Sequence, residues 1–261
     1  MLSEPVANKD LGQHWLNDKD SLEEMVGAAG INQADVVLEV GPGPGSMTRI
    51  LCNNASRVIA IEFDARLAKD LPCIVQASNL EVIHGDILKF NLSDLPTGYK
   101  LATNLPYYLT GHFLRIISES TNPPAAGSLL IQKEVAERIS AQPGHLSVVG
   151  VMMQYYWQVR PGSVVPAGLF TPPPKVDSQI IGLIRRQKPL FGPIEEKRFF
   201  GIVKAGFSQK RKTLLNSLGS GLRLERSELE RKLRNIGIDP KRRAQTLSMH
   251  EWYDIYKTLE T

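Results

Sequence analysis

The chain has 261 residues and a mass of 29.0 kDa, which is enough for one large α/β domain or for a core domain with a small appendage. With 42% hydrophobic and 22% charged residues, its composition is close to the globular average and excludes wholesale disorder. The two cysteines, Cys52 and Cys73, form no CxxC pair and no His/Cys cluster, so the sequence encodes neither a disulfide framework nor a zinc site.

The sequence lacks the signals that direct a chain into a membrane or out of the cell. No run of about 18 apolar residues occurs, and residues 1–10 include Glu4, Lys9 and Asp10 in place of the apolar core of a signal peptide. We therefore expect a soluble, cytoplasmic protein in a reducing compartment, without a metal and with a monomer as the default state.

Charge is divided unevenly along the chain, although the net charge is only +4. Residues 1–184 contain 13 Lys and Arg against 18 Asp and Glu, whereas residues 185–261 contain 18 against 9, giving net charges of −5 and +9. Cations gathered in one region attract phosphates and release counterions, so the pattern favours a polyanionic partner. Solvated faces of ordinary helices would give the same counts.

Apolar runs rich in β-branched residues alternate with amphipathic stretches in the first part of the chain, which is typical of βαβ units around a parallel sheet. A capping box at Ser21–Glu24 predicts the start of the first helix. Three consecutive prolines cannot lie in a central strand, so Phe170–Pro174 is predicted to be an ordered loop at the rim of the sheet. The predicted strands are Val36–Val40, Val58–Glu62, Leu80–His84, Tyr99–Thr103 and Ser128–Gln132, with later ones near Gln154–Arg160 and Ser178–Ile184.

Helical periodicity dominates the last quarter of the chain. The predicted helices are Ile194–Leu218, Ser227–Ile236, which Gly237 terminates, and Met249–Leu259. Lys188-Pro189 and Gly192-Pro193 interrupt both patterns, so we place a domain boundary within residues 185–192, between 188 and 189.

A glycine-rich turn follows the first predicted strand, as Gly41-Pro42-Gly43-Pro44-Gly45, before a helix opening at Met47–Leu51. Glycine permits positive φ and close approach of a nucleotide. The GxGxG spacing differs from the GxGxxG of dinucleotide sites, and the two prolines remove amide donors, which favours a methionine group over a pyrophosphate. Glu62 lies where ribose hydroxyls are held in such folds, so the pattern predicts an adenosyl cofactor. A tight turn without a ligand is the alternative.

Two further motifs follow later strands. Asp86, after the third strand, can accept a hydrogen bond from an adenine amine, although Gly-Asp is also an ordinary turn. Asn104-Leu105-Pro106-Tyr107 ends the fourth strand, where the Asn104 amide oxygen and the Leu105 carbonyl can accept the hydrogens of an adenine amine. Tyr107 offers a face on which an unpaired base can stack, by about 1–3 kcal/mol. The alternative is a strand-end turn with a buried tyrosine.

The sequence resembles the small-subunit ribosomal RNA adenine dimethyltransferases, the KsgA family, which are relatives of the Erm large-subunit enzymes. The resemblance extends nearly end to end. It rests on the ordered motifs Gly12–Leu16, Glu39–Gly43, Asn104–Tyr107, Gln132–Arg138, Phe170–Ser178 and Phe207–Lys212.

The resemblance implies a Rossmann-like α/β methyltransferase domain at residues 1–188 and a small all-α, basic RNA-binding domain at residues 189–261. It implies dimethylation of two adjacent adenosines in a hairpin loop near the 3′ end of 16S rRNA, and a role in 30S biogenesis. Asn104, Leu105 and Tyr107 would present the target adenine, with Phe170 stacking on its other side. The residues that would bind S-adenosyl-L-methionine are His14, Leu16, Gly41, Glu62, Asp86 and Asn104.

The tail at Ile238–Ser248 resembles that of the small-subunit enzymes more than that of Erm, which favours rRNA in the pre-30S particle. An Erm-like enzyme acting on 23S rRNA and an assembly factor whose RNA binding matters more than its methylation are the alternatives. The predicted phosphate contacts are Lys210, Arg211, Lys212, Lys241, Arg242 and Arg243.

Three segments depart from the family pattern. His14-Trp15 stands where Asn-Phe is usual, which leaves open whether His14 contacts the cofactor or only packs. The basic run that often precedes this motif is reduced to Lys9, and Gly144–Val151 matches the family's Leu-Ser-Val segment only in part.

Overall fold

The computed structural model describes residues 7–8, 11–188, 190–192 and 194–260. The expectations for the first ten residues therefore fall largely outside the described residues. Contacts divide the chain into two compact units. We call Met1–Ala136 with Gln158–Arg185 the sheet unit, and Glu137–Trp157 with Arg186–Thr261 the helical unit.

This division differs from the expected boundary, because residues 137–157 group with the C-terminal helices. The reason is an aromatic cluster within the helical unit. The ring of Tyr155 lies 5.7 Å from that of Phe199 and 6.2 Å from that of Phe191, and the Tyr155 carbonyl accepts a hydrogen bond from the Leu190 amide. A stretch predicted partly as a strand is thereby drawn into a helical core.

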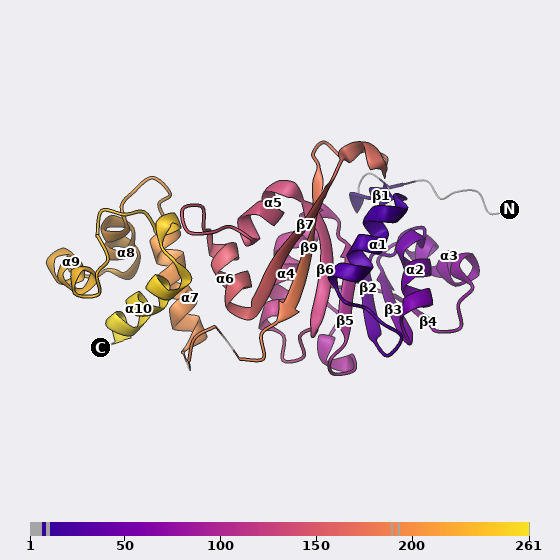
Figure 1. Cartoon of the computed structure of the whole chain (residues 1–261), viewed down its shortest axis with the longest axis horizontal. Coiled ribbons are helices and arrows are strands. Elements are labelled where there is room, and N and C mark those ends of the chain that lie inside the picture. The colour runs from indigo at the N-terminus through magenta and orange to yellow at the C-terminus, as the bar shows by residue number, and fades with distance from the viewer. Residues whose placement is uncertain (1–6, 9–10, 189, 193, 261) are drawn as a thin grey trace. The chain divides into compact units, whose positions relative to one another are not determined.

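The sheet unit is built on a seven-stranded sheet with the order β4-β3-β2-β5-β6-β9-β7 (Figure 1). Neighbours from β4 to β6 are parallel, and β9 runs antiparallel to β6. The strands are β2 (Val36–Val40), β3 (Arg57–Glu62), β4 (Leu80–His84), β5 (Lys100–Asn104), β6 (Ala126–Gln132), β7 (Trp157–Val165) and β9 (Ser178–Arg185). This architecture agrees with the expected α/β class.

Helices alternate with most of the parallel strands along the chain, and a separate two-stranded ribbon pairs β1 (Trp15–Leu16) with β8 (Phe170–Thr171). The helices are α1 (Lys19–Ala28), α2 (Ser46–Asn54), α3 (Ala65–Val75), α4 (Thr110–Glu119) and α5 (Lys133–Ile139), the last of which crosses into the helical unit. Short 3₁₀ turns are η2 (Leu92–Asp94), η3 (Tyr107–Leu109) and η4 (Ala167–Leu169).

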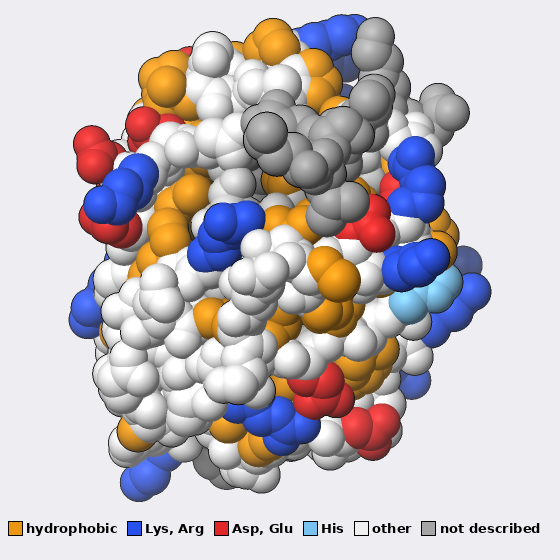
Figure 2. Space-filling view, turned by 90° about the vertical axis from the view of Figure 1, so that its right-hand side faces the viewer, with side chains coloured by type: hydrophobic (Ala, Val, Ile, Leu, Met, Phe, Trp, Pro, Cys, Tyr) orange, Lys and Arg blue, Asp and Glu red, His pale blue; other side chains and the backbone are white. Residues whose placement is uncertain are grey.

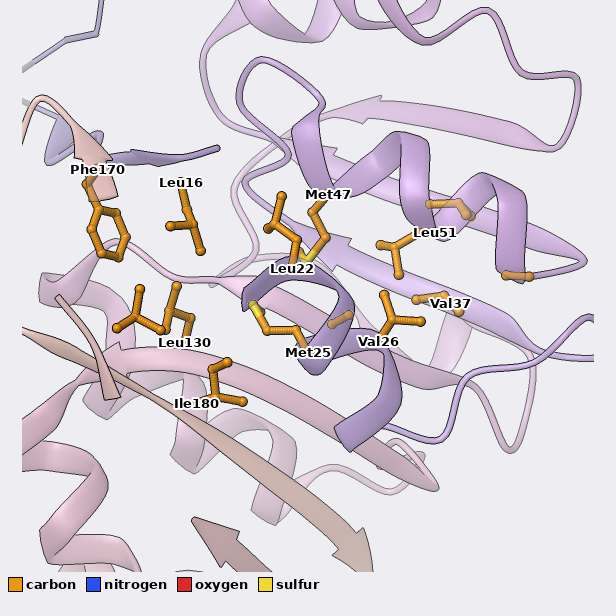
Figure 3. Close-up of a cluster of buried hydrophobic side chains, with 14 residues drawn as sticks. Leu16, Leu22, Met25, Val26, Val37, Met47, Leu51, Leu130, Phe170 and Ile180 are labelled. Carbon is orange, nitrogen blue, oxygen red and sulfur yellow. The ribbon is translucent and has the colours of Figure 1, made fainter. Parts of the chain in front are cut away.

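Figure 3 shows how this ribbon is held in place. Leu16 from β1 and Phe170 from β8 point into a cluster with Leu22 and Met25 of α1 and Met47 of α2, above the sheet residues Val37, Leu130 and Ile180. Both Leu16 and Phe170 are 3% exposed. Burying side chains of this size stabilises the fold by about 1.5–3 kcal/mol each, so the ribbon is anchored by its apolar side chains.

Several local predictions were wrong. Helix α1 begins before Ser21, because the Asp18 carboxylate caps it by accepting from the Ser21 amide and hydroxyl. Phe170 and Thr171 form a strand where a loop was predicted. Residues Gln154–Tyr156 end a helix and do not begin a strand.

The helical unit contains α6 (Val148–Tyr156), α7 (Glu196–Phe207), α8 (Leu214–Leu222), α9 (Arg226–Asn235), η5 (Ala244–Thr246) and α10 (Met249–Glu260), drawn from rose to yellow in Figure 1. The predicted helix Ile194–Leu218 is two helices joined by residues 208–213. Trp252 of α10 is fully buried against Gly206 of α7, where a Cβ would lie 2.4 Å from the indole ring. Over the described part of the chain, every helix is too short or too polar to cross a membrane.

Candidate active site

The order of the parallel strands reverses between β2 and β5, and the two main motifs follow these two strands. In open α/β sheets the crevice at such a reversal, beyond the carboxyl ends of the strands, is where ligands bind. The Thr103 hydroxyl donates to the Val40 carbonyl over 2.7 Å and ties β5 to β2 at this point. A cavity opens here, lined by both motifs, by Glu62 and Asp86, and by residues 11–15.

The glycine-rich loop lies on one side of this cavity. Gly43 has φ +56°, and a Cβ there would lie 3.2 Å from the indole ring of Trp15. Gly45, with φ +85°, is the N-cap residue of α2, and a Cβ there would lie 2.8 Å from Leu71. Positive φ and close packing together explain why these positions are glycine. Because these glycines carry no side chain, the loop backbone is open to a ligand.

Glu62 joins the end of β3 to this loop. It is 5% exposed, and its two carboxylate oxygens accept from the Gly43 amide at 3.1 Å and the Asp64 amide at 2.8 Å. Burial raises the pKa of Glu62, and these two backbone hydrogen bonds oppose the rise. Each oxygen keeps a further lone pair, so the side chain can hold the loop and still accept hydrogen bonds from a ligand.

A second carboxyl group, Glu39, lies on β2 behind the loop and is 1% exposed. Burial is the main cause that raises the pKa of Glu39 to about 8, the nearby charge of Glu62 adds to it, and the Thr48 hydroxyl opposes it. Glu39 is therefore mostly protonated at neutral pH. This neutral state spares the site a second buried negative charge beside Glu62.

The raised pKa of Glu39 predicts a pH-dependent stability. The folded state binds this proton more tightly than the unfolded state, so the stability that Glu39 contributes at low pH is lost as pH rises from its ordinary pKa of 4.5 towards about 8. Between about pH 5 and pH 7 the free energy of unfolding should fall by about 2–3 kcal/mol more in the wild type than in Glu39→Gln.

Urea unfolding of both proteins at the two pH values, with the exposed-site variant Glu23→Gln as control, measures this difference. Equal falls in wild type and Glu39→Gln would show that Glu39 is ionised in the folded state.

Asp86 and Asn104 also face the cavity. The Asp86 carboxylate accepts from the Leu88 amide at 2.9 Å, so one oxygen closes its own turn, and among the described residues nothing bonds the other. The Asn104 side-chain amide donates to the His14 carbonyl at 3.1 Å. This bond fixes the orientation of the amide, and its oxygen has no partner within the described ranges. Asp86 and Asn104 thus each keep one acceptor oxygen available to a ligand.

Tyr107 and His14 also line the cavity. Their rings are stacked, with centroids 5.9 Å apart and planes 22° apart. The His14 Nδ1 lies 2.7 Å from the Pro172 carbonyl, and because a carbonyl only accepts, this nitrogen carries the proton. Burial raises the pKa of Tyr107, which keeps the phenol protonated.

Seven of the predicted cofactor and catalytic residues therefore line one cavity: His14, Gly41, Glu62, Asp86, Asn104, Leu105 and Tyr107. The other two do not. Leu16 and Phe170 lie in the hydrophobic cluster and are each 3% exposed, because the β1–β8 ribbon turns both side chains into the core. Their predicted roles stay predictions.

Sequence reasoning missed three apolar side chains that line the cavity yet remain exposed: Phe63 at 57%, Leu88 at 37% and Tyr108 at 60%. Phe63 directly follows Glu62, and Leu88 lies two residues after Asp86. Their position next to a predicted polar contact was the available signal. Exposed hydrophobic side chains at a cavity mark a surface that a flat ligand can cover.

The face of the sheet unit in Figure 2 carries Lys and Arg intermingled with Asp and Glu, and hydrophobic side chains are exposed between them. This agrees with the low net charge of the first part of the chain. Among the described residues, His, Cys, Asp and Glu do not gather into any group that could hold a metal ion.

In the helical unit, the basic residues predicted to contact RNA lie on two adjoining loops. The Leu214 amide donates to the Arg242 carbonyl at 2.7 Å, and the Leu215 amide donates to the Pro240 carbonyl at 3.1 Å. These bonds bring the segment 210–212 close to the segment 241–243. Exposed on them are Lys210, Arg211, Lys212, Lys241 and Arg243.

Arg242 differs from its neighbours. Its guanidinium pairs with the Glu251 carboxylate, bonds the Thr246 carbonyl at 2.6 Å and is only 31% exposed. The hydrogen bonds from Arg242 contribute to holding the pKa of Glu251 below its usual range, against the effect of burial. Arg242 therefore joins the loop to α10, and the expectation that it contacts phosphate is not supported by its geometry.

Comparisons with known proteins agree on the class. The model of the family "Ribosomal RNA adenine dimethylase" matches residues 6–261. A "Ribosomal RNA small subunit methyltransferase A" of Dehalococcoides mccartyi (strain CBDB1) is 40% identical over 250 residues, covering 94% of this chain and 86% of the relative. The protein of the same name from Shouchella clausii (strain KSM-K16) is 39% identical over 256 residues, covering 94% and 86%.

Two solved structures are similar over nearly the whole chain. A dimethyladenosine transferase from Plasmodium falciparum has a TM-score of 0.78 and 25% identity, covering 93% of this chain and 96% of its own. The 23S rRNA methyltransferase ErmE has a TM-score of 0.78 and 27% identity, covering 95% and 100%.

Fold, site and comparisons define a Rossmann-like methyltransferase that uses S-adenosyl-L-methionine. Within that class, the chain belongs to the ribosomal RNA adenine dimethylase family and is an rRNA adenine dimethyltransferase. The expected family, fold class, enzyme class and cofactor are thereby confirmed.

Proposed function

We propose that this enzyme dimethylates the exocyclic amines of two adjacent adenosines in the hairpin loop near the 3′ end of 16S rRNA, in the pre-30S particle. The observation that carries the chemistry is Asn104, whose oriented amide keeps an unpartnered oxygen at the switch point, within the described ranges. The preference for small-subunit rRNA rests on the names of relatives that are about 40% identical.

The residues of the cavity fit the cofactor at each of its parts. Glu62 offers acceptors for the ribose hydroxyls, and Asp86 offers one for the adenine amine. Phe63 and Leu88 offer apolar surface to the flat base. Gly41 and Gly43 of the glycine-rich loop line the same cavity as Asn104, where the methionine group would lie.

The target amine needs help because its lone pair is delocalised into the adenine ring. We assign to Asn104 Oδ1 and to the Leu105 carbonyl the role of accepting the two amine hydrogens, which favours a tetrahedral nitrogen with its lone pair free. Tyr107 supplies a stacking surface for the base. When bound, the cofactor supplies an electrophilic methyl group on a sulfonium. With the cofactor bound, the nitrogen would accept this methyl group in place of the sulfur and would lose its proton to solvent.

RNA recognition is assigned to the exposed cations of the two adjoining loops. Lysine and arginine contacts to phosphate give affinity that depends on salt and on RNA shape. Five of the six predicted cations are exposed, which supports the proposal, whereas Arg242 supports the loop. The alternative is that these residues are ordinary solvent-exposed charges that make no contact with RNA.

Removing two of these cations should weaken RNA binding in a salt-dependent way. We expect Lys210→Ala with Lys212→Ala to lower affinity for small-subunit particles about tenfold and to reduce the slope of log affinity against log salt by about 1 to 2, between about 50 and 200 mM salt. The double variant Lys19→Ala with Lys69→Ala removes the same charge from exposed sites of the sheet unit and is the matched control. Equal effects from both pairs would show a general effect of net charge.

We further propose that the enzyme acts as a monomer in the cytoplasm and has a role in 30S biogenesis. The test that separates methylation from assembly is maturation of 30S particles in cells that carry only Asn104→Ala. Normal maturation would favour an assembly factor whose methylation is incidental, and a defect would favour a requirement for methylation.

The likeness to ErmE keeps 23S rRNA as the second candidate substrate, because both solved structures share a TM-score of 0.78 with this chain. Mapping the modified nucleotides after reaction with both subunits tests it. Label confined to adenosines near the 3′ end of 16S rRNA is the expected result.

A further inference from the structure

The hydroxyl of Tyr107 is bonded from outside the cavity. Tyr107 Oη and Ser178 Oγ lie 2.8 Å apart and share a hydrogen bond. Ser178 is the first residue of β9, is fully buried, and is not among the described residues that line the cavity. Its contact with the site passes through Tyr107.

Ser178 is itself firmly held. It lies opposite Gln132 in the β6–β9 register. The carbonyl of the preceding residue, Asp177, accepts from the Lys133 amide at 3.0 Å, and its carboxylate accepts from the Ala167 amide at 3.0 Å. The start of β9 is therefore fixed to β6 on one side and to η4 on the other, so the Ser178 hydroxyl is a rigid point of attachment.

The ring of Tyr107 has a second support. The His14 imidazole stacks against it, and the bond from His14 Nδ1 to the Pro172 carbonyl fixes the imidazole plane in turn. The backbone carbonyl of the same His14 accepts from the Asn104 side chain. His14 thus contacts two of the groups to which the reaction is assigned, Asn104 and Tyr107.

We propose that Ser178 and His14 are positioning residues that fix Tyr107 in one orientation, Ser178 at its hydroxyl and His14 at its ring face. The inference rests on the proposed function, in which the Tyr107 ring stacks with the target adenine. A ring held at two points keeps its plane when the base arrives, so less freedom is lost on binding. Because misplacement of a contact group by about 1 Å can cost a hundredfold in rate, a partly released ring should slow the reaction measurably.

The hydrogen bond is tested with Ser178→Ala, Tyr107→Phe and the double variant. Each removes the same bond, so we expect all three to lower kcat with undermethylated small-subunit particles by about tenfold, within a factor of about two of one another. The dissociation constant of S-adenosylhomocysteine should stay at the wild-type value, because Ser178 does not touch the cavity. If the bond only stabilised the fold, the three variants would not share the same fall in kcat. Nor would kcat fall while the dissociation constant of S-adenosylhomocysteine stayed unchanged.

Ser128→Ala is the matched control, because Ser128 is also fully buried, on the neighbouring strand β6, and away from Tyr107. It should turn over at the wild-type rate. If Ser178→Ala does not fold, Tyr107→Phe reports on the same bond with the serine in place.

The ring contact is tested with His14→Ala, for which we expect a fall in kcat of similar size. Tyr107→Ala separates failure of this inference from failure of the proposed function. Low turnover in Tyr107→Ala with wild-type turnover in Ser178→Ala, Tyr107→Phe and His14→Ala would overturn the positioning roles alone. Wild-type turnover in Tyr107→Ala would overturn the assigned role of Tyr107 and this inference with it.

Discussion

Replacing Asn104 by alanine should lower the rate of methyl transfer by about 100- to 1,000-fold, the loss typical when one oriented group that stabilises a transition state is removed. The Asn104 amide is oriented by its bond to the His14 carbonyl, and its oxygen, unpartnered among the described residues, is the group to which we assign the target amine. Alanine removes the acceptor and leaves the nitrogen planar. Cofactor affinity should fall much less, because Glu62 and Asp86 remain.

Single-turnover kinetics with labelled S-adenosyl-L-methionine measure the rate, and calorimetry with S-adenosylhomocysteine measures the affinity. Asn91→Ala, at an exposed 3₁₀ turn, is the control and should behave as the wild type. Unchanged turnover in Asn104→Ala would remove this residue from the mechanism.

Replacing Glu62 by alanine should weaken cofactor binding by about 100- to 1,000-fold. The variant loses the charge-assisted hydrogen bonds assigned to the ribose, each worth about 1.5–3 kcal/mol. It also leaves the Gly43 and Asp64 amides without their acceptor, which releases the loop that lines the cavity. The two effects act in the same direction.

Calorimetric titration with S-adenosylhomocysteine tests this prediction. Glu81→Ala changes the same residue type at an exposed position of β4, paired with Arg57, and should bind as the wild type. Binding within about threefold of wild type in Glu62→Ala would remove Glu62 from cofactor binding, both as a ribose contact and as a support of the loop.

The positions that could be predicted from sequence are those fixed by a strand and the turn after it. Gly41, Glu62, Asp86 and Asn104 each follow or end a β-branched run, and the carboxyl ends of parallel strands meet at one edge. Their shared cavity therefore follows from local pattern and topology together. Their individual roles stay predictions.

The positions that could not be predicted depend on contacts between distant segments. Leu16 and Phe170 pair across the β1–β8 ribbon, and a two-residue strand is too short for its sequence pattern to predict its partner. In the sequence, Arg242 is one cation in a basic run, but in the structure it pairs with Glu251 and stabilises a loop. Propensity describes a residue's neighbourhood in sequence, whereas these roles are set by tertiary packing.

The central claim is adenine dimethylation of small-subunit rRNA, and the most direct measurement is transfer of label from S-adenosyl-L-methionine to undermethylated 30S particles. Parallel reactions contain 50S particles and naked 23S rRNA, and mass spectrometry identifies the modified nucleoside. The account predicts dimethyladenosine in 30S particles and no label elsewhere. Label in 23S rRNA, or no label despite measurable cofactor binding, would contradict it.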